Sequence, residues 1–183
     1  MNELIINLFK YFSKFVPKKT LVNMFIQPDG SRKTGYSDIE SEVLASGDNN
    51  VIDSIEKFVL SINENFVSDR IKNSNGFILF VEYGKLDVIP EVEKGIVQSL
   101  GITVAYNFSD NNNDNINEII HMNQCLEILY KIIRKMKEEQ SELDFCNNAE
   151  LITFPAEILV VDPTSFYGCG GWCAMFNNSN TVL

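Results

Sequence analysis

The residues that come closest to a catalytic arrangement are the one histidine, His121, and Cys125, four positions later. On one helix these side chains lie a turn apart, so the imidazole could take the proton of the thiol and make it a nucleophile. Such chemistry also needs a preorganised oxyanion site, which two residues of one helix do not build. We therefore predict no catalytic pair and expect a surface histidine or a hydrogen-bonded core histidine.

Two further thiols bracket a glycine-rich turn. Cys169 and Cys173 are separated by three residues, a spacing that could bring two thiolates to one metal ion. Structural zinc requires four ligands, however, and the remaining candidates, Cys125, Cys146 and His121, follow no regular spacing. We predict no metal and no cofactor, and expect the cysteines to be reduced thiols.

Three other chemical patterns are incomplete. The segment 110–121 begins like a calcium-binding loop, but Asn115 stands where glycine is needed and His121 where a bidentate glutamate is needed, which leaves at most an adventitious cation. The glycine-rich segment 168–171 is followed by a strand-like segment and lacks the features of a phosphate loop. The 25 acidic residues form no recognisable signature. We therefore predict that the protein is not an enzyme; the alternative is an unrecognised carboxylate or metal site.

Length and composition favour a single domain that spans residues 1–183. Hydrophobic residues make up 45% of the chain and aromatic residues 11%, which excludes general disorder. Lys10 and Lys14 interrupt the apolar start, so it does not resemble a signal peptide, and no run of apolar residues is long enough to span a membrane. We expect a cytoplasmic location. Abundant Asn and Ile with little Ala are typical of an AT-rich microbe or its virus.

Three segments repeat apolar residues at three- and four-residue spacing, as helices with one buried stripe do. They are residues 1–16, which Pro17 ends, residues 51–69, and a long helix that Asp114 or Asn115 caps. The apolar side of the long helix comprises Ile116, Ile119, Ile120, Leu126, Leu129, Ile132, Ile133 and Met136.

The remaining segments favour strands and loops. Residues 77–81 are apolar throughout and predict a strand that is covered on both faces, and residues 102–108 alternate as a half-buried strand does. Further strands are expected at 21–27, at 151–161 with an edge or bulge at Pro155, and at 172–176. Residues 28–50 predict a polar loop, residues 91–100 either a helical turn or a connection, and residues 168–171 a flexible corner. The expected fold is α+β: a mixed, mainly antiparallel sheet of about four to five strands against two to three helices, with an N-terminal amphipathic helix.

Charge is unevenly distributed. The net charge is -10, yet residues 1–35 hold six of the 15 basic side chains and only two of the 25 acidic ones. An acidic body repels phosphates, so we expect no specific nucleic-acid binding. The positive N-terminal segment instead suits an acidic partner, and the nearest such partner is a second copy of the chain.

The apolar stripe of the first helix has three possible partners: the core of its own domain, a neighbouring subunit, or a membrane surface. If it meets a neighbour, the contact combines aromatic and basic residues. The candidate interface residues are Leu4, Leu8, Phe9, Lys10, Phe12, Lys14, Phe15, Lys18, Lys19 and Trp172.

The order of elements from about residue 77 to residue 176 resembles that of small bacteriophage tail-completion and tail-terminator proteins. The resemblance rests on a long helix that leads into a β-rich stretch ending in Gly171-Trp172-Cys173-Ala174-Met175-Phe176. It implies a small sheet packed against helices, assembly of identical copies into a ring at the head-tail neck or the tail, and no enzymatic activity.

These observations together predict a structural subunit of a phage virion. It would form a homo-oligomeric ring, contact neighbouring virion proteins, assemble in the cytoplasm of the host and let DNA pass through an acidic lumen. The alternative is a bacterial accessory or regulatory domain that binds another protein through the same N-terminal segment.

Overall fold

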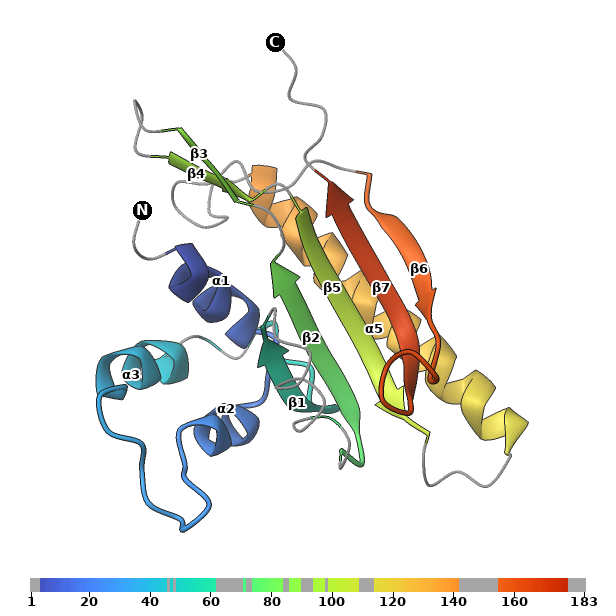
Figure 1. Ribbon diagram of the computed structural model, residues 1–183, viewed down its shortest axis with the longest axis horizontal. Coiled ribbons are helices and arrows are strands. Elements are labelled where there is room, and N and C mark those ends of the chain that lie inside the picture. Colours follow the sequence, from blue (N-terminus) through green and yellow to red (C-terminus); the bar gives the residue numbers. More distant parts are fainter. Residues whose placement is uncertain are drawn as a thin grey trace.

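The structure, a computed structural model, describes residues 4–45, 47, 49–61, 71, 74–83, 86–89, 94–97, 99–108, 114–141 and 155–177. It is an α+β fold, as the sequence predicts: a five-stranded mixed sheet with the long helix α5 behind it and the short helices at one side (Figure 1). The strands follow the order β1-β2-β5-β7-β6. Their bounds are Ile55–Leu60 for β1, Phe77–Tyr83 for β2, Ser99–Asn107 for β5, Glu157–Val161 for β6 and Cys169–Asn177 for β7.

Pairing in the sheet is parallel only between β1 and β2, and the other neighbours are antiparallel. Between β2 and β5 the chain forms a separate two-stranded antiparallel hairpin of β3 (Leu86–Ile89) and β4 (Lys94–Val97). Residues 94–97 and 99–100 are therefore strand, and neither of the two structures expected for 91–100 is correct there. Residues 91–93 lie outside the described part of the chain.

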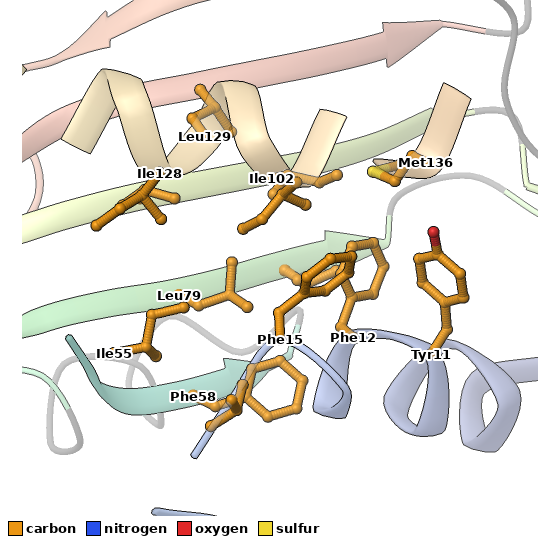
Figure 2. Close-up of a cluster of buried hydrophobic side chains, with 14 of the residues drawn as sticks. Tyr11, Phe12, Phe15, Ile55, Phe58, Leu79, Ile102, Ile128, Leu129 and Met136 are labelled. Carbon is orange, nitrogen blue, oxygen red and sulfur yellow. The ribbon is translucent and has the colours of Figure 1, made fainter. Parts of the chain in front are cut away.

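The helices are α1 (Leu4–Ser13), α2 (Lys18–Met24), α3 (Ser37–Ala45) and α5 (Asn115–Ser141). Helix α1 ends in a tight turn just before Pro17, which has no backbone N–H to continue it. Figure 2 shows α1 and α5 facing each other across one apolar layer. The stripe of α1 thus packs on the core of its own domain, the first of the three alternatives.

The main core lies between the sheet and these helices. Leu79 and Ile102 of neighbouring strands belong to the same buried cluster as Phe12 of α1 and Leu129 of α5 (Figure 2). On the other face of the sheet, Ile78 and Phe80 join a smaller buried cluster. Strand β2 is thus covered on both faces, which confirms the prediction for residues 77–81.

Two predicted elements are wrong in type. Most of the expected strand 21–27 belongs to α2, and the expected helix 51–69 contains β1. The apolar spacing around β1 suits a helix locally, but parallel pairing with β2 stabilises an extended chain. Residues 62–70 lie outside the described chain. The predicted polar loop 28–50 also contains α3. Before that helix the chain turns at Asp29, whose Oδ1 accepts hydrogen bonds from Ser31.

The glycine-rich segment is a corner only at its start. Tyr167 and Gly168 have positive φ values of 53° and 83°, and β7 begins at the next residue. Gly171 lies inside β7, where a Cβ atom would overlap the carbonyl oxygen of Val104 on β5. Glycine is needed there because the two backbones approach closely, and not because the chain is flexible.

Among the residues that the structure describes, no helix combines the length and the apolar character that crossing a membrane requires.

Candidate interaction edge of the sheet

Strand β6 forms one edge of the sheet and carries an unusual amount of exposed apolar surface. It pairs with β7 on one side only. Leu159 is 45% exposed and Val160 is 62% exposed, although the two adjacent side chains point to opposite faces of the sheet. Each face of this strand therefore carries one exposed apolar side chain, although Ile158 of the same strand packs against the main core.

The first turns of α5, on the face of the sheet to which Val160 points, also expose apolar side chains. Ile116, Ile119 and Ile120 are 70%, 60% and 50% exposed. The sequence predicts them on the buried stripe, but the start of the helix projects beyond the strands (Figure 1). The prediction of burial is wrong for these three residues because the stripe continues beyond the sheet that would cover it.

Trp172 connects the strand to the helix. Its backbone pairs with Val160 of β6, and its indole Nε1 donates a hydrogen bond of 3.0 Å to the carbonyl oxygen of Met122 on α5. The indole is half-buried and packs against the main core. Trp172, a candidate interface residue, therefore lies between the two exposed apolar groups and fixes their relative position.

All the side chains of this region that are charged at neutral pH are acidic. Residues 114–130 and 155–177 contain no Lys or Arg. Asp114, Glu118, Glu127 and Glu157 are exposed beside the apolar residues. We call this surface the acidic edge, and it comprises Asp114, Ile116, Glu118, Ile119, Ile120, Glu127, Glu157, Leu159 and Val160.

The apolar interface candidates of the N-terminal helix lie at the opposite edge. Leu8, Phe12 and Phe15 are buried in the core, and Phe9 is half-buried and stacks on Phe58 with ring centroids 5.5 Å apart. Leu8, Phe12 and Phe15 have no free surface in this fold, so their prediction as interface residues is corrected: the core of the same chain already occupies the stripe. The side chain of Leu4 lies outside the described structure.

The basic candidates fall into two groups. Lys10 pairs with Glu42, and Lys14 pairs with Glu139, so both serve contacts within the chain. Lys18 and Lys19 are exposed at the start of α2. Both side chains lie at the surface of the protein.

His121 is held in an aromatic cluster. Its ring stacks on Tyr106 with centroids 3.8 Å apart and an interplanar angle of 24°. Its Nδ1 lies 2.7 Å from the carbonyl oxygen of Asn117. His121 is thus a partly buried histidine with a hydrogen-bonding partner, one of the environments expected.

Cys125 is fully buried one turn further along α5. Burial, with a smaller contribution from Cys169, raises the pKa of the Cys125 thiol to about 12. The thiol therefore stays protonated at neutral pH, and the thiolate that a nucleophile requires is disfavoured.

The other cysteines are also far from a metal-site arrangement. Cys169 and Cys173 lie four residues apart on one extended strand, which separates them by roughly 13 Å. Within the described part of the chain, no three His, Cys, Asp or Glu residues gather as metal ligands. Cys146, like residues 110–113 of the expected calcium-like segment, lies outside it. Asp114 instead caps α5, where its Oδ1 accepts two backbone N–H bonds.

Comparison of the chain with protein-family models, curated proteins and solved structures gave no match. The acidic edge therefore has to be interpreted from its own chemistry. Sequence reasoning missed Leu159 and Val160 as surface residues, although Pro155 indicated an edge near them.

Proposed function

We propose that this chain is a structural subunit whose copies associate through the acidic edge. The observation that carries the proposal is the exposed apolar strand β6 beside the exposed isoleucines of α5. A strand at the edge of a sheet offers unpaired backbone groups, and proteins usually protect such a strand with charges, proline or a covering element. Neither Leu159 nor Val160 provides such protection.

The composition of the edge suits a protein partner. Scattered apolar side chains are common on monomers, but an apolar group rimmed by polar residues marks an interaction site. Here exposed carboxylates share the strand and the helix turns of Val160 and Ile119, a composition that suits an apolar interface core with a charged periphery. A partner that covered the edge would bury the apolar surface and complete the sheet.

The setting that we propose is a ring at the neck or tail of a phage particle, with virion proteins as neighbours and DNA passing through the lumen. The resemblance of residues 77–176 to tail-completion and tail-terminator proteins supports this setting. The net charge of -10 also supports it, because DNA would pass an acidic wall without binding.

The proposal is tested by the size of the purified protein. Val160→Lys places a cation on the apolar edge, and we expect it to shift the protein from a closed oligomer to a monomer in light scattering. Tyr36→Lys is the matched control, because Tyr36 is equally a large exposed side chain but lies just before α3. Electron microscopy of the wild-type oligomer should show closed rings. A wild-type chain that stays monomeric at all concentrations would contradict the proposal and favour an accessory protein-binding domain.

A further inference from the structure

A cleft lies between the later turns of α5 and residues 49–54, the segment that leads into β1. Its volume is about 580 Å³, and small-ligand sites usually have volumes of roughly 300–1,000 Å³. None of the residues that line the cleft belongs to the acidic edge. A ligand held there would therefore be independent of the proposed association.

The buried side of the cleft is fixed by the core. Phe15 is 2% exposed, and its carbonyl oxygen accepts a hydrogen bond of 2.9 Å from the backbone N–H of Ile52. The side chain of Ile52 packs against the main core, and its carbonyl oxygen accepts a hydrogen bond of 3.0 Å from the N–H of Ile55, the first residue of β1. This wall is therefore formed before a ligand arrives, so binding costs little conformational entropy there.

The wall formed by α5 is basic. Lys131, Arg134 and Lys135 line the cleft from one face of the helix, because positions three and four apart lie side by side. The acidic residue of this wall is Glu138, whose carboxylate lies 3.2 Å from Nε of Arg134 and 3.7 Å from Nζ of Lys135. One carboxylate does not balance three cations, so this wall is positive in a chain whose net charge is -10.

Lys131 is the least engaged of these cations. It is exposed and forms no ion pair with a residue that the structure describes, whereas Lys135 also lies 3.6 Å from Glu139. The unpaired carbonyl groups at a helix end favour cations within the last turn, but the last turn of α5 contains no basic residue. The helix end therefore does not account for the three cations, and an anion beside Lys131 would displace no described partner.

The other wall is polar and has no basic side chain. Asn49, Asn50, Asp53 and Ser54 line it with amide, carboxylate and hydroxyl groups. Such groups form hydrogen bonds with the hydroxyl groups of a ligand, as an acidic side chain does with a ribose hydroxyl. The lining as a whole has three basic and two acidic residues, with the basic ones together on α5. The two walls therefore suit two chemically different parts of one ligand.

We propose that this cleft binds a small phosphate ester that carries hydroxyl groups, either a nucleoside phosphate or a sugar phosphate. The phosphate lies against Lys131 and Arg134, since a guanidinium group and an ammonium group both bind phosphate oxygens. The hydroxyl groups meet Asp53 and the neighbouring amides across the cleft. A long polyanion is disfavoured, because the acidic body of the protein repels it.

Calorimetric titration of the full chain tests the proposal with adenosine monophosphate, ribose 5-phosphate and inorganic phosphate. We expect at least one ester to bind roughly tenfold more tightly than inorganic phosphate, because an ester reaches both walls. Tighter binding of adenosine monophosphate than of ribose 5-phosphate would identify a nucleoside phosphate, and equal binding a sugar phosphate. The preferred ester should also raise the melting temperature, since it binds the folded state. Inorganic phosphate that bound as tightly as both esters would overturn the proposal, as would tighter binding of a single-stranded oligonucleotide.

Two variants assign the walls. Lys131→Ala should weaken binding of the preferred ester roughly tenfold, because it removes a charged partner of the phosphate. Asp53→Ala should weaken binding of the ester but not of inorganic phosphate. Lys137→Ala is the matched control, since Lys137 is an exposed lysine of the same helix that does not line the cleft, and it should bind like the wild type. Equal weakening by Lys131→Ala and Lys137→Ala would show a general effect of charge and contradict a site in the cleft.

Discussion

The two edges of the same sheet are built in opposite ways. At β1, the register shifts between Ile55 and Lys57, the exposed residues Glu56 and Lys57 are charged, and the hydroxyl of Thr20 on α2 donates a hydrogen bond of 3.2 Å to the carbonyl oxygen of Ile55. At β6 the pairing with β7 is regular, the one charged residue is Glu157 at the start of the strand, and Leu159 and Val160 are exposed and apolar. Irregular pairing, charged side chains and a covering helix all oppose the pairing of another strand with an edge strand. The β1 edge is therefore protected against strand addition.

The two sides of the sheet also differ in how much apolar surface they bury within the chain. Phe12 of α1 and Phe15, two residues after this helix, are buried near the β1 side, whereas the first turns of α5 leave three isoleucines exposed near the β6 side. The free energy of unfolding should therefore depend mainly on the β1 side, and the association that we propose should depend on the β6 side.

The largest change in the free energy of unfolding is expected on the β1 side, which the short helices cover. Phe12 is fully buried, and Phe12→Ala should lower the free energy of unfolding by about 3–5 kcal/mol, because it leaves a cavity in the core. Urea denaturation of monomeric protein measures the change. The matched variant on the open side, Ile119→Ala, should change this free energy by less than about 0.5 kcal/mol. Equal losses for the two variants would remove the distinction between the sides.

A smaller effect is expected where α1 meets the end of α5. The carboxylate of Glu139 accepts hydrogen bonds from Tyr11 and Lys14. Burial opposes its ionisation, but these hydrogen bonds and the charges of Lys14 and Lys135 outweigh burial and hold the pKa of Glu139 below its ordinary value of 4.5. The ionised form is thus favoured in the folded chain, so this contribution to stability is present above pH 4.5 and is lost as the pH falls through the lowered pKa.

Glu139→Gln should therefore cost roughly 1–2 kcal/mol of unfolding free energy at neutral pH and much less near pH 3. Denaturation curves at the two pH values measure the difference. Glu138→Gln, at the more exposed neighbouring position, is the control and should show little change. A cost for Glu139→Gln that did not shrink on acidification would show that the carboxylate charge is not what joins the two helices.

The smallest change in the free energy of unfolding is expected on the β6 side, at the start of α5. Asp114 caps α5 by accepting hydrogen bonds from the N–H groups of Ile116 and Asn117. Asp114→Ala should lower stability by about 0.5–1 kcal/mol, and Asp114→Asn, which keeps a side-chain oxygen, by less. Hydrogen exchange should be faster mainly in the first turn of α5. If exchange were faster throughout the sheet, this end of the helix would belong to the cooperative core, and the comparison of the two sides would have to be revised.

Local sequence determined the elements whose structure depends on their own residues. The continuous apolar run of β2 and the long periodic stripe of α5 predict their types, and Asp114 and Pro17 predict where helices begin and end. Element type and helix ends depend on interactions between residues that are close in the sequence. A single sequence therefore suffices to predict them. The same holds for the class of fold, which follows from the order of such segments.

Tertiary structure alone decided which surfaces are covered. Residues around Ile55 have helical spacing but form β1, because β2 provides a parallel partner from another part of the chain. Ile116 and Ile132 lie on the same helix and fit the same periodic stripe, yet the first is exposed and the second is buried, because only the later turns of α5 lie over the sheet. Periodicity fixes the direction in which a side chain points from its helix, whereas its burial depends on long-range packing.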